Sequence, residues 1–278
     1  MRVNPLRLYM NMGTLAQLPD WSKAPRGTEK EVCQALREAG FEGLQGGNPA
    51  LCKELGMGYA GGGRVDKAGD AARLVEEGIK AGAVCTTLHV GNGFEDDAQA
   101  GSLIEDILRE SERSRHPLYI ETHRATITQD IWRTLQFVKR YPEVRFNGDF
   151  SHWYTGLEMV YGDLPKKLEL MEPIFERTRF IHGRIGNPGA IQVDIGDGEG
   201  RTYVAHFRDM WTRCFRGFLR SADPGDAFIF APELLFPSIY YAREFPDATG
   251  RMREEGDRWE QALLYGRIAR DCFARAAS

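Results

Sequence analysis

The segment PLYIETHRATITQDIWRTLQFVKRYPEVRFNGDF, residues 117–150, contains one full repeat of the pattern that decides the fold. Its short apolar stretch at 117–123 predicts a strand, and the amphipathic stretch 128–141 predicts a helix. A second strand is predicted at 144–150. Strands that alternate with helices pair in parallel, because each helix carries the chain back to the same end of the sheet. The segment therefore predicts one unit of a parallel α/β fold.

The same alternation runs through the rest of the chain. Further strands are predicted at 6–12, 41–47, 57–63, 83–91, 179–184 and 227–234. Further helices are predicted at 28–40, 49–55, 71–82, 102–113, 166–177, 203–220 and 257–275. Eight strand–helix units in a chain of 278 residues predict a closed (β/α)8 TIM barrel, with one domain over 1–278. An open doubly wound sheet is the alternative, but no GxGxxG motif follows the first strand to support its dinucleotide-binding form.

The composition is that of an ordinary globular protein, with 42% hydrophobic and 27% charged residues. A net charge of −4 gives no overall basic field for nucleic acid. No apolar run approaches the roughly 20 residues that cross a bilayer, and no signal-peptide pattern is recognisable. Five cysteines are scattered without a CxxC pair, which is typical of reduced thiols. We therefore expect a cytoplasmic protein without a nucleic-acid or membrane partner.

Ionisable side chains stand at the carboxyl ends of four consecutive predicted strands: Glu121, Asp149, His182 and Glu233. In a TIM barrel these strand ends surround the active site. Any one of them alone could be an ion-pair partner or a core residue. Three carboxylates and an imidazole at one point, however, repel one another unless a cation lies among them. The sequence thus predicts one divalent metal ion per chain. The oxygen-rich set favours Mn²⁺, with Mg²⁺, Co²⁺ or Zn²⁺ as alternatives.

Four short motifs resemble the xylose isomerase-like TIM-barrel superfamily: IETHR (120–124), GDFSHW (148–153), FIHGRIG (180–186) and APEL (231–234). This superfamily includes sugar isomerases, ketose 3-epimerases, dehydratases and endonuclease IV. The resemblance runs along the whole chain and implies the same four metal ligands. It also implies that the chain could form a homodimer or homotetramer.

The resemblance implies a divalent-metal-dependent isomerase or epimerase of carbohydrate metabolism that acts on a ketose or keto-polyol. Glu121 and Glu233 would then work as acid and base on opposite faces of the substrate, through an enediolate. The family's Asp-x-x-His and His-x-Arg patterns place His152 and Arg184 as substrate-binding residues. The alternatives are a purely structural His152 and an Arg184 that only pairs with a nearby carboxylate.

Further substrate contacts are expected at the same carboxyl ends of the barrel strands. His89 and His123 stand near the carboxyl ends of two predicted strands. Trp153 offers an aromatic face to a sugar, although tryptophan is more often simply packed. The long loops 183–202 and 235–256 are candidates for lids, since loops of this length in a compact barrel are often functional.

Three other functions use the same scaffold. A lyase or dehydratase acting on a keto-sugar or cyclitol would begin with the same proton abstraction, and the sequence does not separate it from an epimerase. A DNA-repair nuclease is disfavoured, because the extra His and Asp ligands are missing and the chain is acidic. A sugar-binding protein without activity has no use for two acid/base groups. The substrate, its phosphorylation and the exact reaction stay open.

Overall fold

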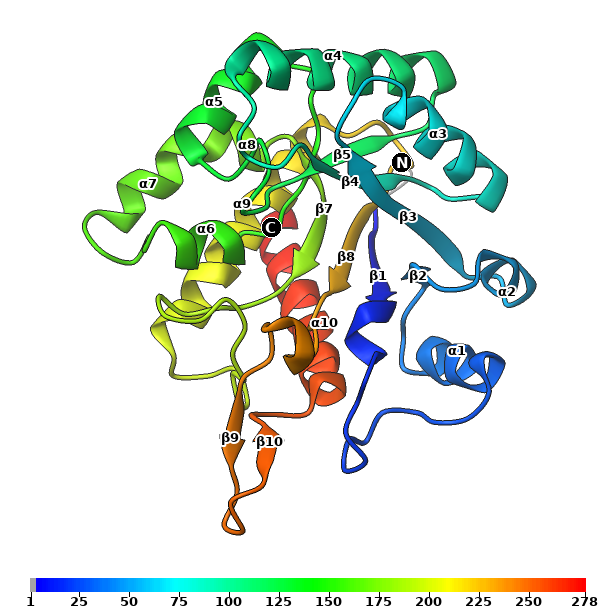
Figure 1. Cartoon of the computed structure of the whole chain (residues 1–278), viewed down its shortest axis with the longest axis vertical. Coiled ribbons are helices and arrows are strands. Elements are labelled where there is room, and N and C mark those ends of the chain that lie inside the picture. The colour runs from blue at the N-terminus through cyan, green and yellow to red at the C-terminus, as the bar shows by residue number, and fades with distance from the viewer. Residues whose placement is uncertain (1–3) are drawn as a thin grey trace.

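The computed structural model describes residues 4–278 and contains a closed barrel of eight parallel strands, ordered as they occur in the chain (Figure 1). The predicted (β/α)8 TIM barrel is confirmed. The barrel strands are β1 (Leu6–Asn11), β2 (Gly43–Gln45), β3 (Gly58–Val65), β4 (Thr86–Val90), β5 (Leu118–Glu121), β6 (Phe146–Asn147), β7 (Thr178–Gly183) and β8 (Phe228–Pro232). β8 pairs with β1 in the register Leu6 to Phe228, which closes the barrel.

Helices surround the barrel and pack against its outer face (Figure 1). They are α1 (Glu29–Glu38), α2 (Pro49–Glu54), α3 (Asp70–Ala81), α4 (Asp97–Ser114), α5 (Ile131–Arg140), α6 (Ser151–Gly156), α7 (Leu164–Leu170), α8 (Glu172–Phe175), α9 (Thr202–Ser221) and α10 (Arg258–Ala277). Two 3₁₀ turns, η1 (Met12–Leu15) and η2 (Pro237–Ile239), follow β1 and β8. No helix within residues 4–278 is long and apolar enough to cross a membrane.

One local prediction was wrong, and two elements were not predicted. The single helix expected at 166–177 is two helices, α7 and α8, which meet at Met171, because Pro173 lacks an N–H and its ring crowds the preceding turn. The short helix α6 was not predicted. The loop 235–256 contains an antiparallel hairpin of β9 (Glu244–Pro246) and β10 (Met252–Glu254), which projects from the body of the protein at the lower end of Figure 1.

Side chains along each barrel strand alternate between the interior and the surrounding helices. On β1, Leu8 lies against Gly266 of α10, so its neighbour Tyr9 points inward. A buried cluster inside the barrel comprises Tyr9, Ala60, Cys85, Phe180, Ile229 and Ala231. Two residues beyond members of this cluster, toward the carboxyl ends, lie Asn11, Thr87, His182 and Glu233. Because side chains two residues apart on a strand point the same way, these polar residues lie next to the apolar cluster, on its carboxyl-end side.

Gly217 lies where α9 crosses α8, and it allows the two helices to approach closely. A Cβ at this position would lie 2.5 Å from Cα of Glu176, a backbone atom that cannot rotate away. We expect Gly217→Ala to lower the free energy of unfolding by about 1–3 kcal/mol, the usual cost of overpacking. The measurement is urea unfolding followed by circular dichroism.

The matched control is Gly156→Ala on α6, where an added Cβ would meet no atom within 4 Å. Its effect should stay within about 0.5 kcal/mol. Equal effects of the two substitutions would show that the helix crossing tolerates a methyl group.

His116 precedes β5 and is buried, with Nε2 lying 2.9 Å from Oγ1 of Thr86. Burial lowers the pKa of His116 below its usual 6.5. Below pH 6.5 the unfolded chain takes up a proton that the folded protein does not, so the free energy of unfolding should fall as the pH drops. Urea midpoints at pH 7.5 and 5.5 should differ more for the wild type than for His116→Gln. The same pH dependence of the urea midpoint in both proteins would contradict a contribution of His116.

All five cysteines are buried free thiols. Burial raises the pKa of Cys52 to about 11 and that of Cys85 to about 12. A thiol of this kind is largely protonated and inaccessible near neutral pH, so it reacts slowly.

Candidate active site

Four predicted ligands come together at the carboxyl end of the barrel. Glu121, Asp149, His182 and Glu233 each offer a donor atom, and these atoms lie within 4.8 Å of one another. Glu121 ends β5 and His182 lies in β7, while Asp149 lies two residues after β6 and Glu233 directly follows β8. Three of the four side chains are buried, and Glu233 is partly buried.

His182 occupies the middle of this cluster. Its Nδ1 lies 3.2 Å from Oε2 of Glu121 and 3.3 Å from Oε2 of Glu233. Its Nε2 lies 2.8 Å from Oε1 of Gln45, an oxygen that also accepts a hydrogen bond from Asn11. Because an amide oxygen only accepts, Nε2 carries a proton, which leaves the lone pair of the neutral imidazole on Nδ1, toward the carboxylates.

The charges around His182 shift two pKa values strongly. Burial would lower the pKa of His182, but Glu233 and Glu121 outweigh it and raise the pKa to about 9. Burial would raise the pKa of Glu121, but His182 and His89 outweigh it and hold the pKa well below its usual range. Without another cation, the imidazolium of His182 therefore balances part of the carboxylate charge.

Arg184 supplies the second positive charge. Its Nη1 lies 3.3 Å from Oδ2 of Asp149, its Nη2 pairs with Oε2 of Glu233, and its Nε donates to the backbone oxygen of Glu233 at 3.0 Å. Burial would raise the pKa of Asp149, but Arg184 and then His152 outweigh it and hold the pKa below its usual range. The structure thus places Arg184 as a buried ion-pair partner of two site carboxylates.

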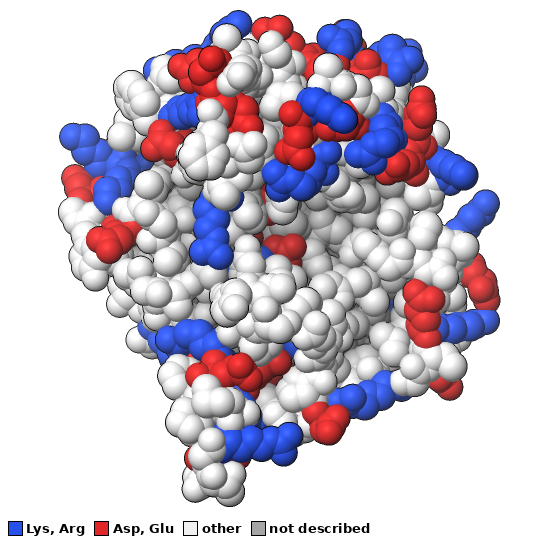
Figure 2. Space-filling view, viewed as in Figure 1, with Lys and Arg blue, Asp and Glu red and all other residues white. Residues whose placement is uncertain are grey.

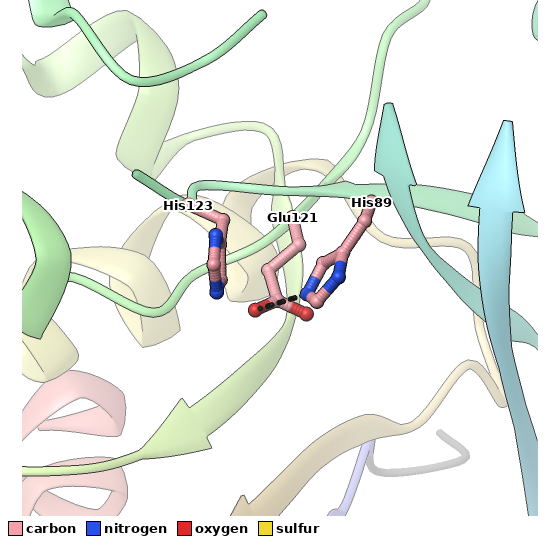
Figure 3. A group of neighbouring side chains, drawn as sticks. All are labelled: His89, Glu121 and His123. Atoms are coloured by element: carbon pink, nitrogen blue, oxygen red, sulfur yellow. Dashed lines mark ion pairs between the residues drawn. The ribbon is translucent and has the colours of Figure 1, made fainter. Parts of the chain in front are cut away.

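Three histidines form a row beside Glu121. Nε2 of His89 lies 3.1 Å from Oε1 of Glu121, and Figure 3 shows this carboxylate between the rings of His89 and His123. The ring centroids of His89 and His123 are 4.3 Å apart, and those of His123 and His152 are 3.7 Å apart. Burial lowers the pKa of His123 to about 3, with help from His152, while Glu121 overcomes the burial of His89 and raises its pKa.

Trp153 does not take the position expected of a sugar-stacking residue. Its side chain is fully buried, packs against Phe150, and donates from Nε1 to the backbone oxygen of Thr128 at 2.8 Å. The reason is α6, which turns this residue inward beneath the rim. Trp153 thus supports the loop after β5, and no free face of it is offered to a ligand.

Three amide side chains of the site were missed by the sequence analysis. Asn147 donates to Oε2 of Glu121 at 3.0 Å, and Asn11 donates to Oε1 of Glu233 at 2.9 Å. Gln45 contacts His182, as described above. All three stand at the last positions of their strands, β1, β2 and β6, which is where residues of a barrel reach the site. Such amides orient the ionisable groups that contact them.

A cavity of about 500 Å³ opens beside the cluster. Figure 2 shows a hollow near the middle of the face toward the viewer, with acidic atoms visible within it. The polar side chains that line the cavity include Asn11, Gln45, Arg64, His89, Glu121 and Glu233. Its size suits a small molecule.

The donor set fits a divalent cation. Three carboxylates and one imidazole match the preference of hard and borderline divalent ions for oxygen and nitrogen. Within residues 4–278, Oδ1 of Asn147 is buried without a hydrogen-bond partner, and Oδ2 of Asp149 makes no hydrogen bond beyond its ion pair with Arg184 and a longer contact with His152. Buried oxygens of this kind are expected to have a partner, and a bound ion with its water would supply one.

The sequence matches no protein-family model and no curated protein. Its fold, however, is similar to that of solved proteins. A xylose isomerase-like TIM barrel protein from Mycobacterium smegmatis, in complex with magnesium, has a TM-score of 0.59 at 13% identity, with 99% of this chain and 98% of that chain covered. A D-tagatose 3-epimerase-like protein has a TM-score of 0.57 at 11% identity, covering 98% of each chain.

A third similar structure is the probable 3-DHS dehydratase AsbF from Bacillus anthracis, with a TM-score of 0.57 at 13% identity. The match covers 84% of this chain and 94% of that one. At these identities the likeness establishes the fold alone. That fold is the xylose isomerase-like type of TIM barrel.

Proposed function

We propose that the protein is a divalent-metal-dependent isomerase or epimerase that acts on a ketose or keto-polyol. One observation carries the proposal: Glu121 and Glu233 both contact Nδ1 of His182, and both line the same cavity. Two carboxylates at one reacting carbon can remove a proton and return one. Similar folds in an epimerase-like protein and in a dehydratase support an enzyme of this general kind.

The cation would be held by Glu121, Asp149, His182 and Glu233, and manganese is the first candidate. The magnesium complex of the mycobacterial protein supports a divalent ion in general. Bound there, the ion would supply Lewis-acid polarisation of a substrate carbonyl, which makes the neighbouring C–H more acidic.

The two carboxylates are held for proton transfer by different partners. Glu233 is fixed by Asn11 at Oε1 and by Arg184 at Oε2. Glu121 is fixed by Asn147 at Oε2 and by His89 at Oε1. One carboxylate takes the proton beside the carbonyl, and the other delivers a proton to the opposite face. The side chain of His89 is 34% exposed, so it can pass a proton between Glu121 and water.

The test measures bound metal and then hydrogen exchange. Elemental analysis after Mn²⁺ loading should give one or more ions per chain in the wild type and fewer in Asp149→Asn. Glu105→Gln, which removes an exposed carboxylate that pairs with Arg140, is the matched control and should behave as the wild type. The Mn²⁺-loaded protein should then exchange solvent deuterium into a member of a panel of ketoses and keto-polyols.

Absence of both bound metal and exchange would refute the proposal. Formation of a dehydrated or cleaved product in place of an isomer would instead assign the site to a lyase, which begins with the same proton abstraction.

A further inference from the structure

We propose that the protein binds a small organic phosphate in a cavity at the amino end of the barrel, opposite the candidate active site. The cavity has a volume of about 700 Å³. Arg145, which directly precedes β6, and Arg179, the second residue of β7, both line it. Because all barrel strands are parallel, their amino ends lie together, away from the four predicted metal ligands at the carboxyl ends. The cavity is therefore a separate site and depends on no particular reaction.

Three arginines gather at this end of the barrel. Arg145 and Arg177 donate to the same backbone oxygen, that of Pro142, at 3.1 Å each. Within residues 4–278, no carboxylate oxygen lies within 4.0 Å of a guanidinium nitrogen of Arg145, Arg177 or Arg179. Burial and then Arg177 lower the pKa of Arg145, while burial and then Arg145 lower the pKa of Arg179. Like charges held this close repel one another, and an anion among them would relieve the repulsion.

The arginines keep N–H groups that a ligand could use. The hydrogen bonds of Arg145 all come from Nη1, which donates to the backbone oxygens of residues 142–144. Those of Arg179 come from Nη1 and from Nη2, which donates to Oγ of Ser221 at 2.8 Å. Within the part of the chain that the structure describes, Nε and Nη2 of Arg145 and Nε of Arg179 are thus unused. Guanidinium groups bind phosphate oxygens in pairs, and the charge and three oxygens of a phosphate suit several arginines at once.

A second cavity meets the first at these groups. It has a volume of about 260 Å³ and shares Arg145, Arg179 and Ser221 with the larger cavity. Arg177 and Arg220 also line it. The junction of the two cavities is therefore the most basic point of this end of the barrel, and it is where we place the phosphate.

The carboxylates that line the two cavities do not cancel this charge. Glu42 pairs with Arg7, and Glu176 pairs with Arg220, at 3.1 Å each. All five carboxylates are exposed: Glu42, Glu143, Glu176, Asp223 and Asp226. Water and salt screen exposed charges more strongly than half-buried ones, such as the guanidiniums of Arg145 and Arg179.

The larger cavity also reaches the apolar cluster inside the barrel, which accounts for the organic part of the ligand. Tyr9, Cys85 and Ile229 belong to that cluster and line the cavity, together with Tyr119. A Cβ at Gly58 would lie 1.9 Å from Oη of Tyr9, so only glycine leaves room for this phenol. Burial raises the pKa of Tyr9 to about 12, so its hydroxyl stays protonated and can donate a hydrogen bond. An aromatic or other apolar body fits beside these side chains, with its phosphate among the arginines.

The experiment titrates the full chain with phenyl phosphate by isothermal titration calorimetry, in EDTA so that no metal in the active site binds the phosphate. We expect one phenyl phosphate per chain. Inorganic phosphate lacks the ring, phenol lacks the phosphate, and benzoate carries one negative charge, so each should bind about tenfold or more weakly. Arg145→Gln and Arg179→Gln should each weaken the binding of phenyl phosphate about tenfold or more, the effect of losing a charged hydrogen bond.

The matched control is Arg267→Gln, which removes an exposed arginine of α10 that lines neither cavity, and it should bind as the wild type does. Circular dichroism of each variant confirms that lost binding does not reflect a lost fold. Equal affinity of the wild type, Arg145→Gln and Arg179→Gln would overturn the site, as would absence of binding to the wild type. Benzoate bound as tightly as phenyl phosphate would overturn the assignment to a phosphate. None of these results would affect the proposed catalytic centre.

Discussion

Enzyme carrying Glu233→Gln should exchange substrate hydrogen with solvent about 10²–10⁴-fold more slowly than the wild type, the range that a positioned acid/base group contributes. Glutamine keeps the size of the side chain and can still accept the hydrogen bond from Asn11, but it cannot hold a proton at neutral pH. The measurement is deuterium incorporation into the substrate that the ketose panel identifies, at saturating Mn²⁺.

The Mn²⁺ concentration separates two roles of Glu233. If the residue only holds the ion, excess Mn²⁺ should restore the rate of Glu233→Gln. If it transfers a proton, the rate stays low when the site is full. Full recovery would leave Glu121 as the remaining acid/base candidate and would contradict the two-carboxylate reaction.

Arg184→Met should lower the free energy of unfolding, measured in EDTA, by about 3–5 kcal/mol, the usual cost of removing one partner of a buried ion pair. The side chain of Asp149 is fully buried and that of Arg184 is 1% exposed, so water does not replace the lost partner. Asp149 and Glu233 would then face each other without the guanidinium between them.

Divalent metal should reverse part of this loss. An ion among the carboxylates supplies the charge that Arg184 supplied, and binding to the folded state alone stabilises it. Thermal unfolding with and without Mn²⁺ should therefore show a larger metal-dependent shift for Arg184→Met than for the wild type. Arg213→Met, which breaks a partly exposed ion pair with Glu172 and Asp209, is the control and should cost no more than about 1 kcal/mol. Equal losses in the two variants would contradict the argument.

The barrel could be predicted because its signal is repeated along the whole chain. The sequence pattern of a single strand–helix unit is weak evidence for the fold. Eight such units in this order, however, predict parallel pairing and closure of the barrel. The convergence of the four predicted ligands followed from the same logic, since Glu121 and Glu233 stand at equivalent ends of their strands.

The roles of residues whose environment depends on tertiary packing were harder to predict from the sequence. Asn147 lies in a strand of only two residues, where no alternation is visible and both neighbours are buried. The burial of Trp153 could not be read from the sequence, because α6, which buries it, is too short to give a periodic pattern. The contacts of Arg184 with Asp149 and Glu233 join three different strand ends, and the sequence does not show which charged groups at a rim pair with one another.

The buried thiols make the protein convenient for site-directed labelling. None of its five cysteines is exposed, so the native sequence offers no competing surface thiol. Ala248 is exposed in the turn of the β9–β10 hairpin, the part that projects farthest from the barrel in Figure 1. A fluorophore or spin label attached there through Ala248→Cys would report whether this hairpin moves when a ligand binds, on a molecule otherwise unmodified.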